Sequence, residues 1–194
     1  MKIVLASLNK NKVREMRAPL EALGIELVSQ AELGVAGSAV EDGETFEENA
    51  EKKARFVLEA TGLPALADDS GLSVDALDGA PGVHSHRFGN KDSDAARCEY
   101  LLQKMADVPD ERRGAKFVCV ITVLFPDGGK LVARGECPGV ILRERRGTGG
   151  FGYDPLFLYE PLGKTFAELD EKEKNSISHR ARACEAMKAL LAGE

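Results

Sequence analysis

One segment near the start of the chain joins an apolar stretch to an amphipathic one. A loop that enters a helix N-terminus presents free backbone N–H groups and a partial positive charge, and two lysines here add full charges. The segment can therefore hold a polyphosphate, although an ordinary strand-to-helix turn with an Asn cap explains it as well. It is not a P-loop, because the glycines and the Gly-Lys-Ser/Thr ending are missing. Its residues are Ser7, Leu8, Asn9, Lys10, Asn11 and Lys12.

Acidic side chains form a second candidate site. Asp68, Asp69, Ser70 and Gly71 follow the apolar residues 65–67, and Glu41 and Asp42 lie upstream. Carboxylates at the carboxyl end of a strand lie where α/β folds bind ligands, and Mg²⁺ takes few carboxylates together with phosphate oxygens and water. Adjacent residues of an extended strand point to opposite faces, so one Asp could hold a metal or a water while the other is structural. Asp, Ser and Gly also favour tight turns, which leaves a plain turn as the alternative.

Two further segments could carry chemistry. Residues 147–155, Gly-Thr-Gly-Gly-Phe-Gly-Tyr-Asp-Pro, let the backbone approach a ligand closely, and Phe151 could stack on a nucleobase. A flexible hairpin loop is the alternative. The second segment is residues 174–180, in which the Ser178 to Arg180 trio opens the last helix, and helix capping by Ser with a solvated basic turn is the alternative. We expect His84 and His86 to lie on a strand with surface or structural roles, because no carboxylate or Cys partner stands at ligand spacing.

The elements that would position these residues follow from hydrophobic periodicity. Residues 2–7 and 25–28 read as strands on either side of a helix that Gly24 ends, which is a βαβ unit with parallel pairing. We expect helices over 44–60, with a Thr45–Glu48 capping box, and over 93–105, with strands over 72–77, 117–125 and 130–136. The first helix should bury Val13, Met16, Leu20 and Leu23. The last helix should bury Ile177, Ala181, Cys184, Met187 and Leu191. The pattern predicts an α/β fold with a long mixed sheet flanked by helices.

The composition limits the classes of function. The chain has 194 residues, 43% of them hydrophobic, and a formal net charge of −6, which favours one soluble domain and disfavours binding to nucleic acid. No apolar run approaches the roughly 18 residues that span a bilayer, and the N-terminus lacks a signal peptide, so we expect a cytoplasmic protein without membrane contact. Cys98, Cys119, Cys137 and Cys184 form no C-x-x-C pair and read as small buried hydrophobes.

Taken together, the motifs resemble those of the non-canonical purine NTP pyrophosphatase family, also called the inosine triphosphatase or Ham1-like family. The resemblance runs nearly end to end, and several long motifs in one order are more specific than any single motif. The matching segments are Ser7-x-Asn9-x-x-Lys12-x-x-Glu15, Thr45-Phe46-x-x-Asn49-Ala50-x-x-Lys53-Ala54, Ala67-Asp68-Asp69-Ser70-Gly71-Leu72, Gly79-Ala80-Pro81-Gly82-Val83, Gly149-Gly150-Phe151-Gly152-Tyr153-Asp154-Pro155 and Ile177-Ser178-His179-Arg180.

The resemblance implies a single domain over residues 1–194 with an elongated mixed sheet and two lobes around a central cleft. It also implies a homodimer and Mg²⁺-dependent hydrolysis of ITP, dITP and XTP to the monophosphate and pyrophosphate. Glu41 and Asp69 would serve the metal, and Asp69, supported by Asp68, would activate the attacking water. The other implied substrate contacts are the six residues Ser7 to Lys12 and Lys53 at the phosphates, Ser70, and, around the base, Phe151, Gly152, Tyr153, Asp154, Lys174, His179 and Arg180.

Two departures from the family pattern and three rival hypotheses complete the prediction. Leu8 stands where many members have glycine, and His84 and His86 stand where Tyr and Ala are common, so a contact could change there without loss of the chemistry. The rivals are a Maf-like pyrophosphatase for modified pyrimidine nucleotides, a nucleotide-binding regulator without turnover, and a structural partner protein. The Gly-Gly-Phe-Gly-Tyr-Asp-Pro loop and the Ser-His-Arg trio disfavour the first. The acidic set disfavours the second, and the lysine loop with a glycine-flanked Phe disfavours the third.

Overall fold

The computed structural model describes residues 1–21 and 24–193, which form two compact units. Unit 1 consists of Met1–Ser70, Cys119–Gly135 and His179–Glu194, and unit 2 of Gly71–Val118 and Glu136–Ser178. The described strands form a sheet of order β2-β1-β3-β4-β5-β6-β7. Three strands run from one unit into the other: β3 (Ala65–Val74), β4 (Gly114–Leu124) and β5 (Lys130–Ile141).

Unit 1 begins with the predicted βαβ unit. Strand β1 (Lys2–Leu5) pairs in parallel with β2 (Glu26–Ser29) and with β3, and α1 (Lys10–Glu21) connects the first two strands. Met16 and Leu20 are fully buried, as their helical spacing predicts, whereas Leu23 lies outside the described residues. The parallel pairs here and the antiparallel pairs β5–β6 and β6–β7 make the sheet mixed, which confirms the predicted α/β class.

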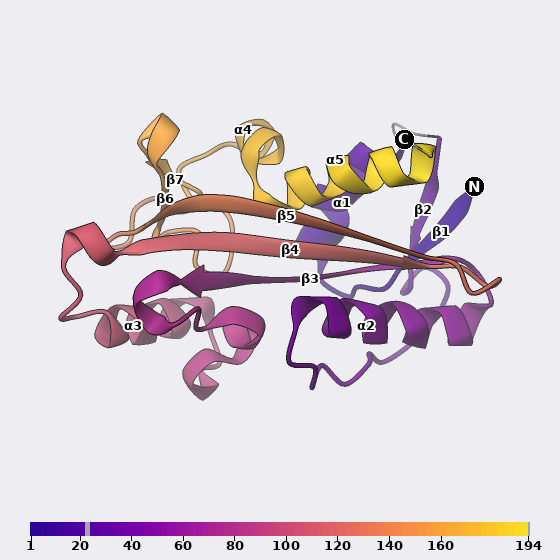
Figure 1. The fold of residues 1–194 in the computed structure, drawn as a ribbon, viewed down its shortest axis with the longest axis horizontal. Helices are drawn as coiled ribbons and strands as arrows, with labels where there is room; N and C mark the ends of the chain where they lie inside the picture. The colour runs from indigo at the N-terminus through magenta and orange to yellow at the C-terminus, as the bar shows by residue number, and fades with distance from the viewer. Residues whose placement is uncertain (22–23, 194) are drawn as a thin grey trace. The chain divides into compact units, whose positions relative to one another are not determined.

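The helices of unit 1 cover both faces of its strands. Figure 1 shows α1 and α5 (His179–Ala192) on one face and α2 (Phe46–Thr61) on the other. The core divides in the same way: Leu66 packs with residues of α1 and α5, and Ala65 and Ala67 pack with residues of α2. Because side chains alternate along a strand, residues 66, 68 and 70 of β3 face α1 and α5, and residues 65, 67 and 69 face α2.

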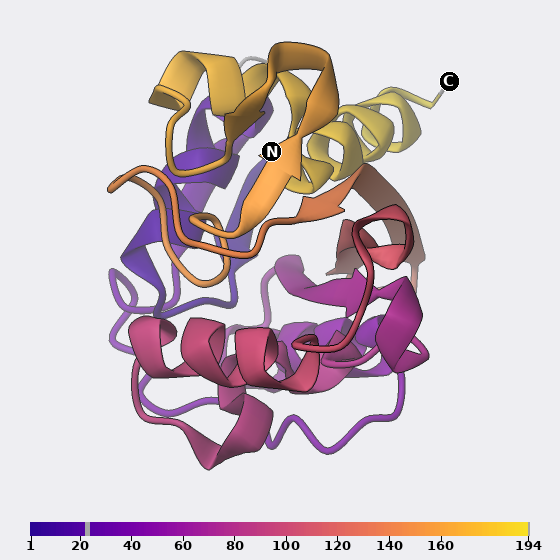
Figure 2. The same ribbon diagram turned by 90° about the vertical axis from the view of Figure 1, so that its left-hand side faces the viewer.

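Unit 2 has its own apolar core. It contains α3 (Asp94–Lys104), β6 (Phe157–Tyr159), β7 (Lys164–Thr165) and α4 (Glu171–Ile177), and Figure 2 shows α3 and α4 on opposite sides of its strands. The core is built around Phe117, Phe157 and Phe166, whose ring centroids lie 4.6–5.6 Å apart. The unit also includes the 3₁₀ segments η1 (Asp75–Leu77), η2 (Gly82–Asn90), η3 (Asp110–Arg112) and η4 (Glu160–Leu162).

Helix starts agree with the sequence because their caps are local. Thr45 accepts a hydrogen bond from Glu48 N at the start of α2, and Ser93 accepts one from Ala96 N at the start of α3. The Thr45–Glu48 capping box is half formed, because the Glu48 carboxylate accepts from Glu44 N. No helix in the described part of the chain is long and apolar enough to cross a membrane.

Four local predictions are wrong. Residues 68–71 were expected at a strand end or in a turn, but they lie inside β3. The strand expected over 72–77 ends at Val74, because residues 75–77 form η1. His84 and His86 lie on the 3₁₀ segment η2, so the expected strand geometry is absent, and both are exposed. The last helix is two helices, because Ser178 has extended backbone between α4 and α5, and Ile177 therefore belongs to α4.

Candidate active site

The loop between β1 and α1 is a capped helix start. Asn9 Oδ1 accepts hydrogen bonds from Asn11 N at 3.0 Å and Lys12 N at 3.3 Å, and Ser7 Oγ accepts one from Asn9 N. The Asn cap considered from the sequence is therefore present. It leaves the helix N-terminus oriented toward the loop, where its positive end favours an anion.

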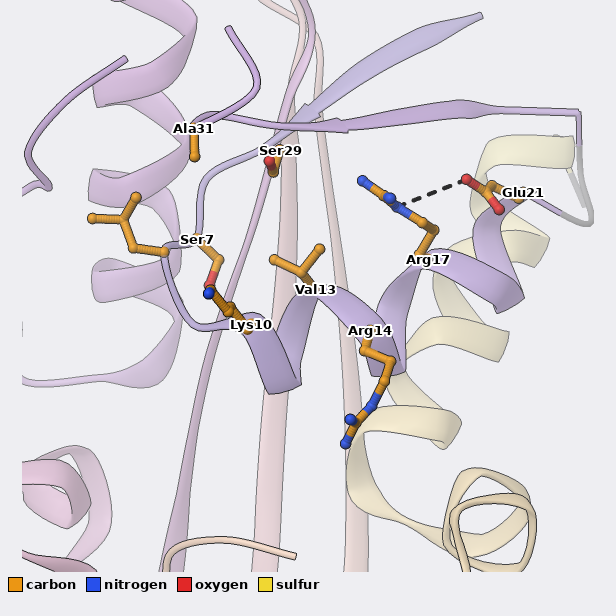
Figure 3. Close-up of a pocket in the computed structure, with 9 residues that line it drawn as sticks. Ser7, Lys10, Val13, Arg14, Arg17, Glu21, Ser29 and Ala31 are labelled. Carbon is orange, nitrogen blue, oxygen red and sulfur yellow. Dashed lines mark ion pairs between the residues drawn. The ribbon is translucent and has the colours of Figure 1, made fainter. Parts of the chain in front are cut away.

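The two lysines of this loop serve different places in unit 1. Lys12 Nζ lies 3.0 Å from Asp68 Oδ2, so this side chain faces β3. Lys10 lines a pocket of about 490 Å³ that extends along α1, where Arg17 pairs with Glu21 (Figure 3). The pocket residues are Ser7, Leu8, Lys10, Val13, Arg14, Arg17, Glu21, Ser29 and Ala31. The predicted phosphate-binding side chains of the loop therefore do not all lie at one place, since Lys12 lies at Asp68 and Lys10 at the pocket.

Asp68 lies in a buried ionic cluster on the face of β3 that α1 and α5 cover. Its Oδ2 accepts a hydrogen bond from Ser70 Oγ at 2.8 Å and lies 3.5 Å from Arg180 Nη2, and Arg180 also pairs with Glu15. Burial acts to raise the pKa of Asp68, but the cations Lys12 and Arg180 outweigh it and hold that pKa well below its usual range. Asp68 is thus an anion at neutral pH that holds two cations.

Asp69 lies on the opposite face, against α2. Lys53 Nζ lies 3.2 Å from Asp69 Oδ1 and 2.9 Å from Glu41 Oε2, and Asn49 Nδ2 donates to Asp69 Oδ2 at 3.2 Å. Burial raises the pKa of Asp69, and this effect exceeds the opposing charge of Lys53. A buried carboxylate with a raised pKa is a stronger base than an exposed one, which suits proton abstraction from a water.

Glu41 and Asp69 are the candidate ligands for a divalent cation. Among the described residues no three acidic, His or Cys side chains form a ready-made metal cage. Mg²⁺ needs less from a protein, because it is commonly held by one or two carboxylates together with phosphate oxygens and waters. Glu41 and Asp69 converge on one positive charge, the Lys53 ammonium. Hard oxygen donors around a cationic position fit Mg²⁺.

The glycine-rich loop of unit 2 is organised around a buried ion pair. Lys174 Nζ lies 2.7 Å from Asp154 Oδ2 and 4.7 Å from the centre of the Phe151 ring, and Phe151 N donates to the same Asp154 oxygen. Gly150 has a φ of +70°, and a Cβ there would lie 2.1 Å from Asp154 Oδ2. Hydrogen bonds and an ion pair therefore fix the conformation of the loop, unlike the flexible hairpin that was the alternative from the sequence. Phe151 is half-buried in this loop.

The remaining predicted residues are buried or held by a hydrogen bond to the backbone or from it. Tyr153 is 3% exposed and donates its hydroxyl to Ser85 O, and burial raises its pKa, so its ring is part of the core of unit 2. Gly152 N donates to Asp94 Oδ2 at 2.7 Å. His179 is the first residue of α5 and is 5% exposed, so the solvated basic turn considered for this segment is wrong.

Sequence reasoning gave no role to three residues that these clusters contain. Glu15 follows Lys12 by three positions on α1, and Asn49 precedes Lys53 by four on α2, so both spacings place a second polar side chain on the same helix face. That signal was available in the sequence. Asp94 carried no such signal, because its partner Gly152 lies 58 residues further along the chain.

Comparison with known proteins agrees with these features. The sequence profile of the Ham1 family matches residues 3–190. The chain is 53% identical to the dITP/XTP pyrophosphatase of Haemophilus ducreyi over 193 residues, covering 98% of each chain, and 51% identical to that of Escherichia coli K12, covering 98% of this chain and 96% of the relative.

Solved structures give the same assignment. The fold superimposes on a HAM1 protein from Coxiella burnetii with a TM-score of 0.91 at 44% identity, covering all of both chains. It superimposes on the Staphylococcus aureus Ham1 protein with a TM-score of 0.89 at 38% identity, covering 100% of this chain and 99% of the other. The chain with the Asp68-Asp69 pair and the glycine-rich loop is thus a member of the Ham1 family.

Proposed function

We propose that this protein hydrolyses the non-canonical purine nucleoside triphosphates ITP, dITP and XTP to the monophosphate and pyrophosphate. The observation that carries the proposal is the buried Asp69, which has a raised pKa and shares the Lys53 ammonium with Glu41. The names of the relatives support it, since proteins about half identical over nearly the whole chain are dITP/XTP pyrophosphatases.

In this reaction a water attacks the α-phosphorus, a new O–P bond forms, and the bond to the bridging oxygen breaks to release pyrophosphate. Asp69 takes the proton of the attacking water. Lys53 and Lys12 stabilise the negative charge that gathers on the phosphates. Asp68 lies on the face of β3 opposite to Asp69 and holds Lys12, whose Nζ is 3.0 Å from Asp68 Oδ2. Asp68 supports the site without taking the proton, because its own pKa is held low.

Mg²⁺ is proposed as the cofactor. Glu41 and Asp69 would hold it, and when bound it would neutralise phosphate oxygens and lower the pKa of a water. Lys53 would then move from its position between the two carboxylates toward the phosphates, which its flexible stem allows.

Base recognition is proposed for the glycine-rich loop. Phe151 offers a ring face for stacking, and Lys174 next to it supplies donors for the 6-oxo group of hypoxanthine or xanthine, where adenine carries a donor. The resemblance places Arg180 near the base as well. Its contacts with Glu15, Asp68 and Ser70 support another role, in which it positions the residues that touch substrate.

The test of the proposed function is pyrophosphate release from ITP, XTP, GTP and ATP, with Mg²⁺ and with a chelator. We expect strong release from ITP and XTP, little from GTP and ATP, and none with the chelator. A folded protein that binds purine nucleotides without releasing pyrophosphate would be a regulator, and preference for modified pyrimidine nucleotides would indicate the Maf-like activity.

Asp69→Asn tests the general base. The amide keeps the shape of the carboxylate but cannot accept the proton, so we expect kcat to fall by roughly 10²–10⁴. Melting temperature should stay near that of the unmodified protein, because the amide can still accept from Asn49 Nδ2. Retention of most of the activity would remove Asp69 from this role.

We also propose that residues 1–194 form a single catalytic domain, that the protein is a homodimer, and that it works in the cytoplasm. The motif resemblance supports the dimer, and the acidic, soluble composition supports the compartment. Sedimentation equilibrium of the purified protein tests the dimer, and a single species at the mass of one chain, 20.9 kDa, would contradict it.

A further inference from the structure

Asn49 connects two parts of the acidic site that the sequence treats separately. It lies in the second turn of α2 and is 1% exposed. Its Oδ1 accepts a hydrogen bond from Gly43 N at 2.8 Å, and its Nδ2 donates to Asp69 Oδ2 at 3.2 Å. Because the oxygen must face a backbone N–H, the NH₂ group must face Asp69, and the orientation of the amide is settled.

Asn49 and Lys53 together hold both oxygens of Asp69. They are four residues apart, so they lie on the same face of α2, one turn above the other. Asn49 donates to Oδ2 and Lys53 to Oδ1, each at 3.2 Å. In the proposed function Lys53 moves toward the phosphates, whereas the Asn49 amide is buried and is held at its other end by Gly43 N. Asn49 is therefore the fixed support of the carboxylate.

The same amide sets the segment that carries Glu41. Gly43 lies two residues after Glu41, and a Cβ at Gly43 would lie 2.7 Å from Asn49 Oδ1 and 2.8 Å from Glu48 Cβ. The close approach therefore requires glycine. One side chain thus determines the placement of Asp69 directly and of Glu41 through the backbone at Gly43.

We infer that Asn49 is a positioning residue for the proposed hydrolysis. Asn49 orients the Asp69 carboxylate and fixes the position of the segment that carries Glu41 relative to that carboxylate. The inference rests on the proposed function. Outer partners of this kind typically change metal affinity or activity by 10–100-fold when removed, and a carboxylate displaced by about 1 Å can cost as much.

The test compares three variants with the unmodified protein. Asn49→Asp keeps an acceptor for Gly43 N but loses the donor to Asp69, and Asn49→Leu loses both. Glu48→Leu is the matched control, because Glu48 ties the same segment to α2 through Glu44 N without touching Asp69. For the two Asn49 variants we expect kcat for ITP to fall about 10–100-fold with KM changed less than about threefold. Glu48→Leu should stay within about twofold of the unmodified kcat.

Melting temperatures and crystal structures complete the test. If the Asn49 variants fold poorly, Gly43→Ala displaces the amide without replacing it, and the same fall in kcat is expected. A crystal structure of Asn49→Leu should show the Asp69 carboxylate rotated away from its position here. An unmoved carboxylate, an unchanged kcat, or an equal loss in Glu48→Leu would overturn the inference. If the unmodified protein releases no pyrophosphate, the proposed function fails by itself, and the carboxylate position in the crystal still decides the role of Asn49.

Discussion

Lys10 and Lys12 lie two positions apart in one loop, yet their surroundings differ. Lys12 is 3.0 Å from the buried Asp68, whereas Lys10 is exposed at the α1 pocket. We expect Lys12→Ala to lower kcat/KM for ITP by about 10²-fold or more, as loss of a preorganised cation at a developing charge does, and Lys10→Ala to change it only a few-fold. Steady-state kinetics of both variants measure this. Equal losses would mean that both side chains reach the phosphates.

The ionisation of Asp68 should stabilise the fold in a defined pH range. Its pKa in the folded protein lies below the unfolded value of about 3.9, so the stabilisation is present above about pH 4 and is lost as pH falls toward the folded pKa. Asp68→Asn leaves Lys12 without its anion and Arg180 with Glu15, and it should cost roughly 3–5 kcal/mol at neutral pH. Urea unfolding at several pH values should show this difference shrinking below pH 4. A difference independent of pH would contradict the assignment.

At the scale of residues, local rules predicted the directions of side chains but not their contact partners. The opposite directions of Asp68 and Asp69 follow from the alternation of side chains along a strand, and the sequence predicts them. The partner of Arg180 does not follow from any local rule, because Glu15 lies 165 positions away and meets it only when α1 and α5 pack together. A base contact was therefore expected where an ionic cluster was found.

At the scale of elements, helix starts were predictable and strand lengths were not. Caps such as Thr45 and Ser93 act within a few residues, so their signal is in the sequence. The Asp-Asp-Ser-Gly segment has the composition of a turn, but neighbouring strands and buried cations hold it extended inside β3. Strand propensity depends on such neighbours more than on the residues themselves.

The contact between β5 and α5 depends on a glycine. A Cβ at Gly135 would lie 2.2 Å from His179 O and 2.3 Å from Ala183 N, so the helix backbone rests directly on the strand. We expect Gly135→Ala to destabilise the protein by about 1–3 kcal/mol, because the helix must move away. Gly129→Ala is the control, since the atom nearest to its added Cβ is a carboxylate oxygen at the end of the Asp127 side chain, 3.1 Å away, and not helix backbone. Urea unfolding compares the two, and equal stabilities would contradict the close contact.

At the scale of the whole molecule, the sequence predicts an α/β chain with a mixed sheet but not the division into two units. Each unit is assembled from segments distant in sequence, and β3, β4 and β5 belong to both. Three boundaries fall inside strands, after Ser70 in β3, after Val118 in β4 and after Gly135 in β5, and the fourth falls between α4 and α5 after Ser178. The central cleft and the elongated outline implied by the family stay predictions.

The shared strands lead to a prediction about unfolding. If one unit lost its structure, β3, β4 and β5 would lose half of their pairing, so we expect both units to unfold in one cooperative transition. The buried thiols report on each unit, Cys98 on unit 2 and Cys184 on unit 1, and burial raises the pKa of both, that of Cys98 to about 11. Neither should react with a thiol reagent in the native protein, since the thiolate is the reactive form.

Two variants that retain only Cys98 or only Cys184 allow the transition to be measured at each site. In a urea series, both thiols should become reactive at the same midpoint, and that midpoint should match the loss of helical circular dichroism. A matched control with one cysteine placed at the exposed Val40 should react at every urea concentration. Separate midpoints for Cys98 and Cys184 would show that the units fold independently, and the continuity of the three strands would then be a structural feature without thermodynamic coupling.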